Sequence, residues 1–160
     1  MYQNSRELFE AAHAASMDAA KISKELEALD ERAARVGTPS LEPHGRGTRD
    51  ADPIGRRVAH KLDREKILER RLEEDYRLID SACWILYGED GISDGLASIA
   101  PPWWADAIYH HYLALRTWDE VAELVMFSKR YVLERVGAAF DLMDANGMAS
   151  TVEGRRSAEG

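Results

Sequence analysis

The side chains best suited to a chemical task lie in one short stretch, which reads SKRYVLER from position 128. This stretch contains Lys129, Arg130, Tyr131, Glu134 and Arg135. An arginine can donate two hydrogen bonds to guanine, a glutamate can accept one from cytosine, and a lysine suits phosphate oxygens. The stretch therefore has the chemical groups of a surface that contacts nucleic acid.

Two short amphipathic helices joined by a tight turn would position these side chains. Thr117 is placed to cap the first helix, and its apolar face is formed by Trp118, Val121, Ala122 and Leu124. Ser128 is placed to cap the second helix, and its apolar positions are Val132, Val136, Ala139, Phe140 and Met143. This order of helix, short turn and helix is how many DNA-binding proteins place a second helix in the major groove. We therefore expect double-stranded DNA as a partner, with the helix 128–143 as the reader and further contacts from Arg116, Thr117 and Ser128.

The sequence contains few residue patterns that are typical of catalytic or metal-binding sites. Capping accounts for Ser128, and Cys83 lies on the apolar side of an expected helix. His110 and His111 are adjacent, so on a helix they point about 100° apart and do not converge on a metal. The chain also has no glycine-rich phosphate-binding motif. We expect no enzymatic activity, no metal and no cofactor.

Composition points to one soluble domain, or to one small domain with an extended helical element. The 160 residues are 45% hydrophobic and 31% charged, with a net charge of −8. The longest apolar run, 82–87, is far too short to span a bilayer, and no secretory signal is evident. One cysteine suits a reducing compartment, so we expect a cytoplasmic protein.

Charge is distributed unevenly along the chain. Residues 101–144 contain four basic and seven acidic residues, whereas residues 46–71 contain nine basic and five acidic residues. Because local basic density governs phosphate contact, we consider further phosphate contacts from Arg56, Arg57, Lys61 and Arg64. The alternative is a solvated face of a charged helix.

Two long helices are predicted in the first half of the chain. In 5–36, apolar residues alternate at spacings of four and three, which is a heptad seam whose first half is mostly alanine. The second helix, 53–87, has this expected buried side: Val58, Leu62, Leu68, Leu72, Tyr76, Ile79, Cys83 and Leu86. A flexible loop at 37–55 would join them into a coiled-coil-like hairpin. The partner of each seam is either the other helix or a second copy, and we expect a homo-oligomer, with a dimer favoured.

The expected organisation is all-α. A long helical hairpin at 1–87 is followed by a linker at 88–102. A third helix opens at Pro101 and Pro102, and the small trihelical helix-turn-helix unit spans 103–146. The remaining residues, 147–160, are expected to form a disordered tail.

Residues TWDEVAEL at 117–124 and SKRYV at 128–132 resemble region four of bacterial sigma factors. The wider layout is similar to phage-borne late-gene transcriptional regulators of the ArpU and RinA type. That similarity rests on VGTPS at 36–40, DPIG at 52–55 and HYLALRTW at 111–118.

The resemblance implies a DNA-binding regulator of phage or prophage origin. Glu120 and Ala122 match the family pattern of the first helix, and Ser128 would cap the reader helix. Its DNA-facing positions would be Lys129, Arg130, Tyr131, Glu134 and Arg135. This chain departs from the pattern in having Met126 at the usual turn glycine and Gly137 inside the reader helix.

Two other hypotheses remain open. The acidic balance of 101–144 favours a non-catalytic module that docks on RNA polymerase or on another protein. A phage packaging subunit, similar to the small terminase, would also combine a helix-turn-helix with an oligomerising helical part.

Overall fold

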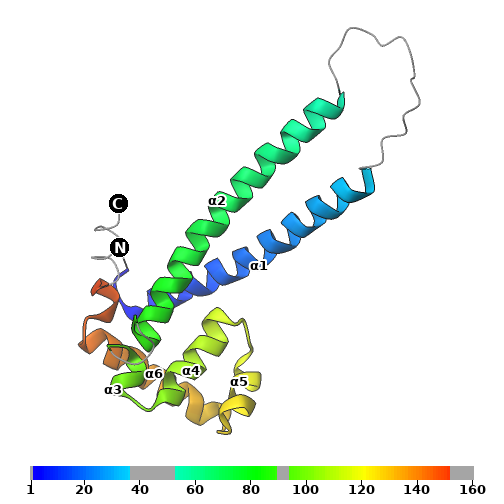
Figure 1. Cartoon of the computed structure of the whole chain (residues 1–160). Helices are drawn as coiled ribbons and strands as arrows, with labels where there is room; N and C mark the ends of the chain where they lie inside the picture. Colours follow the sequence, from blue (N-terminus) through cyan, green and yellow to red (C-terminus); the bar gives the residue numbers. More distant parts are fainter. Residues whose placement is uncertain (1, 37–52, 90–93, 152–160) are drawn as a thin grey trace, which may run out of the picture. The chain divides into compact units, whose positions relative to one another are not determined.

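The computed structural model describes residues 2–36, 53–89 and 94–151, and these residues form helices joined by short turns and loops, with no strand among them. The elements are α1 (Ser5–Val36), α2 (Pro53–Tyr87), α3 (Leu96–Ile99), α4 (Pro102–Ile108), η1 (Tyr109–Leu113), α5 (Trp118–Val125) and α6 (Lys129–Ala145) (Figure 1). A long α1/α2 hairpin is followed by several short packed helices, which confirms the predicted all-α fold. Both long helices have the predicted bounds. Most of the expected loop, 37–52, lies outside the described residues.

The chain forms two compact units, and both long helices take part in each of them. One unit consists of Met1–Asp18 with Asp75–Gly160, and the other is Ala19–Glu74. We call them the helix-turn-helix unit and the hairpin unit. These divisions fall inside α1 and α2, whereas the sequence had suggested a boundary near residue 87.

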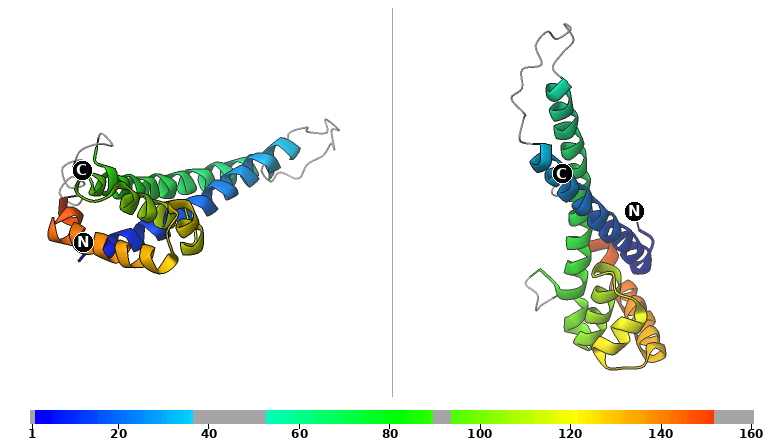
Figure 2. Two further views of the ribbon diagram at one scale, coloured as in Figure 1. Left: turned by 90° about the horizontal axis from the view of Figure 1, so that it is seen from below. Right: turned by 90° about the vertical axis from the view of Figure 1, so that its right-hand side faces the viewer.

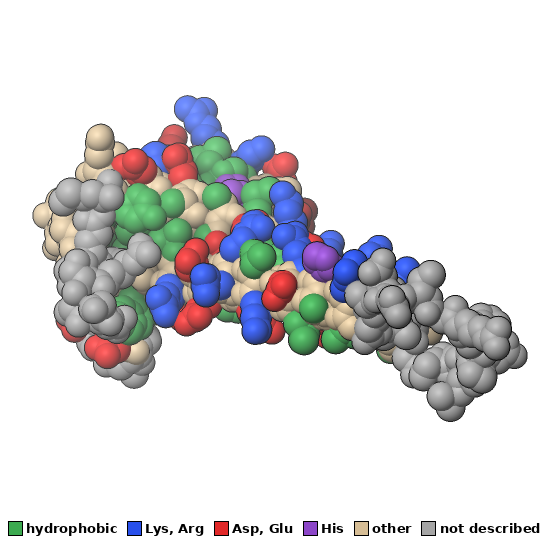
Figure 3. Space-filling model, turned by 90° about the horizontal axis from the view of Figure 1, so that it is seen from above, with side chains coloured by type: hydrophobic (Ala, Val, Ile, Leu, Met, Phe, Trp, Pro, Cys, Tyr) green, Lys and Arg blue, Asp and Glu red, His purple; other side chains and the backbone are tan. Residues whose placement is uncertain are grey.

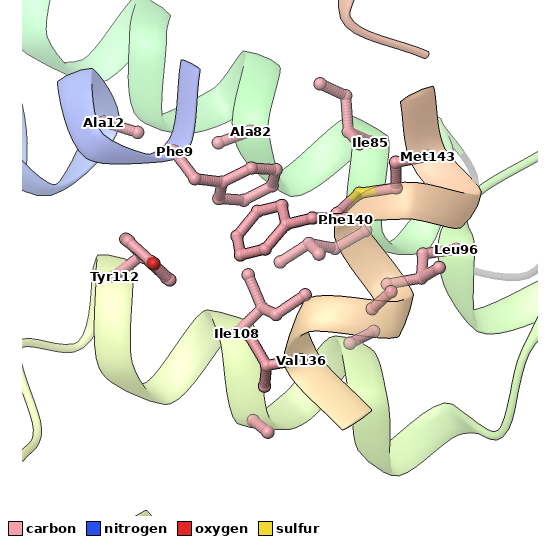
Figure 4. Close-up of a cluster of buried hydrophobic side chains, with 14 of the residues drawn as sticks. Phe9, Ala12, Ala82, Ile85, Leu96, Ile108, Tyr112, Val136, Phe140 and Met143 are labelled. Atoms are coloured by element: carbon pink, nitrogen blue, oxygen red, sulfur yellow. The ribbon is translucent and has the colours of Figure 1, made fainter. Parts of the chain in front are cut away.

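The helix-turn-helix unit has an aromatic core. The rings of Phe9, Tyr112 and Phe140 pack edge to face, with centroid distances of 5.7 to 5.9 Å (Figure 4). Aliphatic side chains surround them, and Ile108 and Met143 are fully buried. Such aromatic pairs add about 0.5–1.5 kcal/mol beyond the burial of their area. This core joins the first turns of α1 to α6.

Part of the expected linker, 88–102, belongs to this core. Leu96 in the short helix α3 is fully buried and packs with the core cluster. Gly95 precedes it, and a Cβ atom there would collide with the backbone at Tyr87 and Gly88. The linker prediction is therefore wrong for α3, because the burial of Leu96 draws this segment against the other helices.

The helix that opens at Pro102 continues from α4 into η1. Here the Ala114 N–H donates to the Tyr109 carbonyl at 3.0 Å, five residues back, which widens the helix.

The beginning of the expected tail is also folded. Residues 148–151 form a helical turn, and Ala149 is buried. The prediction of disorder is therefore wrong for this turn, where Met148 and Ala149 pack on the core. Residues 152–160 lie outside the described residues.

The hairpin unit pairs α1 with α2 in antiparallel fashion (Figure 2). Ile22 and Leu68 are buried, and the Arg64 guanidinium lies 2.8 Å from the Glu25 carboxylate across the pair. The alanine half of the predicted α1 seam is buried, as expected, from Ala12 to Ala19.

The expected buried side of α2 is only partly correct. Val58 and Leu62 are each 50% exposed and Tyr76 is 49% exposed, while Leu68 and Leu86 are fully buried. Although the sequence pattern grouped them, Leu68 lies on a different side of α2 from Val58 and Leu62. The helix α2 therefore packs against α1 with the face that contains Leu68. Val58 and Leu62, one turn apart, are left exposed as a short apolar stripe on α2. Figure 3 shows exposed hydrophobic side chains scattered among charged ones.

Candidate nucleic-acid interface

Thr117 caps α5 as the sequence predicts. Its backbone is extended, and its hydroxyl oxygen accepts a hydrogen bond from the Glu120 N–H at 3.3 Å. The hydroxyl group in turn donates to the Glu120 carboxylate at 3.2 Å. The cap satisfies one of the free N–H groups at the helix start, and the acidic residues Asp119 and Glu120 suit its positive end.

The turn between α5 and α6 requires a left-handed residue, and that residue is Met126. Its φ is 62° and its ψ is 35°, and its side chain is 88% exposed. The Phe127 N–H then donates to the Ala122 carbonyl at 3.2 Å and closes the turn. A side chain in this conformation costs roughly 1–2 kcal/mol, which a glycine would avoid.

Ser128 caps α6, again as predicted. Its hydroxyl oxygen accepts from the Tyr131 N–H at 3.3 Å. All five apolar positions predicted for this helix are buried: Val132, Val136, Ala139, Phe140 and Met143. The helix-turn-helix therefore has the predicted caps and the predicted inward face of α6. On α5, Val121 and Ala122 are buried as expected, whereas the prediction is wrong for Leu124, which is 47% exposed because it lies on the outer side of this short helix.

Four residues at the start of α6 line an open depression: Lys129, Arg130, Leu133 and Glu134. The Arg130 side chain is 92% exposed and lies 3.5 Å from the Glu134 carboxylate. Lys129 pairs with Asp119 of α5 at 3.4 Å. Exposed ion pairs of this kind contribute about 0–1 kcal/mol, so both cations can exchange their partner for a phosphate at small cost. The pairing with Asp119 is a contact that the sequence reasoning missed.

Tyr131 and Arg135 are held differently from the other predicted reader residues. Tyr131 stacks on Trp103 at 5.8 Å and contacts Phe127 at 5.2 Å. The Arg135 guanidinium lies 5.0 Å from the Tyr131 ring centre and 6.0 Å from that of Trp104. These contacts place both side chains in an aromatic cluster that links α4 to α6. This cluster was not predicted from the sequence, although the spacing of Phe127 and Tyr131, four residues apart, is a sequence signal that could have revealed it.

Arg116 is exposed in the short loop between η1 and α5, and its backbone organises the start of α5. Its carbonyl accepts a hydrogen bond from His111 Nδ1 at 2.8 Å. The His111 ring stacks on Trp118 at 3.8 Å and lies parallel to His13 at 5.5 Å. Burial lowers the pKa of His111 and outweighs the hydrogen bond to the Arg116 carbonyl, which raises it, while the neighbouring His13 lowers it as well. Neutral His111 thus fixes the segment that precedes the cap Thr117.

The four basic residues considered for phosphate contact all belong to the hairpin unit. Arg56 and Arg57 are exposed. Lys61 lies 3.3 Å from Glu65 and 3.8 Å from Asp30, and Arg64 pairs with Glu25. Two of these four cations are therefore engaged with carboxylates of their own unit.

Cys83 is half-buried, and burial together with Asp80 raises the pKa of its thiol. A raised pKa disfavours the nucleophilic thiolate. Across residues 2–36, 53–89 and 94–151, no three His, Cys, Asp or Glu side chains are grouped so that they could hold a metal ion. Within those same ranges, no helix is both long and apolar enough to cross a membrane.

Comparison with known proteins found no matching family model, no matching curated protein and no matching solved structure.

Proposed function

We propose that this chain is a DNA-binding transcriptional regulator whose helix α6 enters the major groove. The observation that supports this most directly is the capped α5–turn–α6 unit, which leaves Arg130 92% exposed at the start of α6. The first turn of a reader helix is where side chains reach base edges. Arg130 would read guanine, Glu134 would accept from cytosine, and Lys129 would contact phosphate.

The transcriptional role and a phage origin rest on the resemblance of 117–124 and 128–132 to region four of bacterial sigma factors. The similarity to regulators of the ArpU and RinA type adds the expectation of late-gene control. A regulator of this kind acts on DNA in the cytoplasm.

A homodimer would compensate for the small contact area of one reader helix. The exposed stripe on α2 supplies a surface for the second copy, since Val58 and Leu62 are each 50% exposed. Two copies would double the phosphate contacts and set the spacing of two half-sites. Analytical ultracentrifugation of the chain and of Leu62→Glu tests this dimer, because a charge in the stripe should shift it to monomer.

The DNA-binding proposal is tested by a fluorescence anisotropy titration at about 50 mM salt, where phosphate contacts are strong. The probe is a duplex of the DNA that flanks this chain's own gene. Arg130→Ala should weaken binding by about tenfold or more, as the loss of a bidentate base contact predicts. Arg32→Ala removes the same charge from an exposed position in the hairpin unit and should have little effect. No binding by the unaltered chain, or equal binding by Arg130→Ala, would contradict the proposal.

A second candidate is a module that docks on a protein such as RNA polymerase. It is favoured by the exposed apolar side chains at the turn, where Met126 is 88%, Leu124 47% and Phe127 43% exposed. Residues 94–151 also have four basic and eight acidic residues, which suits a basic protein surface better than DNA. A pull-down of RNA polymerase after nuclease treatment separates the two candidates. An association bridged by DNA disappears on treatment, whereas a direct protein contact persists and is lost in Met126→Glu.

A further inference from the structure

Leu133 is an apolar side chain placed among charged ones on the outer face of α6. It is 41% exposed, whereas the neighbouring Val132 is fully buried and Val136 is 3% exposed. Leu133 shares the open depression with Lys129, Arg130 and Glu134. The two valines therefore pack in the core, whereas Leu133 lies on the outer face of α6, where a partner of this helix can contact it.

The register of α6 places Leu133 one turn beyond Arg130 on the same side of the helix. With a rise of about 1.5 Å per residue, the two positions are roughly 4.5 Å apart along the helix axis. This distance is close to the rise of about 3.4 Å between successive base pairs. Two such side chains can therefore reach neighbouring base pairs.

Gly137 follows Leu133 by a further turn. Apart from its chain neighbours and the nearby backbone of α6 itself, a Cβ atom at this position would meet no atom of the described residues within 4 Å. Because Gly137 has no side chain, the surface of α6 next to Leu133 is unobstructed, and the helix can approach the base edges in a DNA groove closely.

We propose that Leu133 recognises thymine through its C5-methyl group, at a base pair next to the one that Arg130 contacts. The inference rests on the proposed function, because it requires α6 to lie in the major groove. The thymine methyl group is the apolar feature of the major-groove edges, and an apolar side chain is its natural partner. Contact between the two removes apolar surface from water, and the charged neighbours of Leu133 cannot do this.

Replacement of thymine by uracil tests this contact, because it removes the methyl group and leaves the hydrogen-bonding edge intact. The probe is the duplex that the full chain enriches from a random pool at about 50 mM salt. Each thymine in the enriched site is then replaced singly by uracil, and Kd is measured by anisotropy. The unaltered chain should bind about fourfold more weakly at one such position, as the loss of one buried methyl contact predicts.

Leu133→Ala should bind the thymine and uracil duplexes equally, and Leu133→Ile should keep the preference for thymine. The matched control is Leu124→Ala, which truncates a leucine of similar exposure (47%) on α5 and should behave like the unaltered chain. Thermal melting by circular dichroism checks that each variant folds.

A preference for thymine that survives in Leu133→Ala overturns the inference, and so does an unaltered chain that is indifferent at every thymine. Either result leaves the proposed function standing. Failure to enrich any duplex overturns the proposed function and the inference together.

Discussion

The helix-turn-helix unit and the hairpin unit differ in both core and charge. The helix-turn-helix unit has a core of interlocking aromatic rings, and its described residues include six basic and 14 acidic side chains. The hairpin unit buries fewer large side chains, and its described residues include eleven basic and nine acidic side chains. The helix that we propose as the reader of bases therefore belongs to an acidic unit, while the basic excess lies in the other unit. The contribution of the reader helix to DNA binding and the contribution of the basic residues therefore have to be tested separately.

The largest expected effect is on the free energy of unfolding, and it comes from the contrast between a buried ring of the helix-turn-helix unit and an exposed side chain of the hairpin unit. Phe140 is 2% exposed and contacts the rings of Phe9 and Tyr112, so Phe140→Ala should cost about 3–5 kcal/mol of unfolding free energy. Ile67→Ala in the hairpin unit should change it by less than about 0.5 kcal/mol, because Ile67 is 54% exposed and lies outside the stripe of Val58 and Leu62. Urea denaturation followed by tryptophan fluorescence is a suitable measurement, since all four tryptophans lie in the helix-turn-helix unit. Equal costs for the two variants would contradict a main contribution of the aromatic core to stability.

The turn of the helix-turn-helix gives the next largest effect. Met126→Gly should stabilise this unit by about 1–2 kcal/mol, because glycine adopts the left-handed conformation without steric cost. Glu123→Gly is the matched control, since it places glycine in the regular part of α5 and should destabilise by about 1 kcal/mol. The measurement is the melting temperature of each variant. A Met126→Gly protein with a lower melting temperature than the unaltered chain would contradict the prediction and show that the Met126 side chain makes a stabilising contact.

The features that the sequence predicted well depend on short-range interactions. The caps at Thr117 and Ser128 act within three residues, and the ends of α1 and α2 follow from local turn residues and periodicity. The rotation of α2 could not be predicted, because Leu62 and Leu68 are both apolar and tertiary packing decides which is buried.

The candidate site shows the same limit. The sequence identified Lys129 and Arg130 as exposed cations, but it could not reveal that Asp119 pairs with Lys129 across the turn. It also placed Arg135 toward DNA, whereas contacts with rings of α4 and α6 hold its guanidinium. Such pairings join residues that the fold alone brings together.

The difference in charge between the units leads to a prediction on binding. Asp119→Asn should release Lys129 and strengthen DNA binding by up to about fivefold, or roughly 1 kcal/mol. The slope of log affinity against log salt should become steeper by about 0.9, the value for one added phosphate contact. Glu25→Gln makes the same change of charge beside Arg64 in the hairpin unit. A larger gain from Glu25→Gln than from Asp119→Asn would assign the phosphate contacts to the hairpin unit instead.

The smallest expected effect concerns pH and involves His111 of the helix-turn-helix unit. Burial is the main cause of its lowered pKa, the hydrogen bond to the Arg116 carbonyl opposes it, and the charge of the neighbouring His13 lowers the pKa as well. The unfolded chain, with an ordinary histidine pKa of about 6.5, therefore takes up the proton before the folded chain does. Stability is retained above this pH and decreases as the pH falls below about 6.5, because the unfolded state then binds more protons. The ring is partly exposed, so screening by solvent limits the loss of stability to a few tenths of a kcal/mol.

His111→Phe keeps a ring against Trp118 without the titrating group. The melting temperatures of this variant at about pH 7.5 and 5.5 should therefore differ less than those of the unaltered chain. An undiminished difference in the variant would mean that other groups cause the pH dependence.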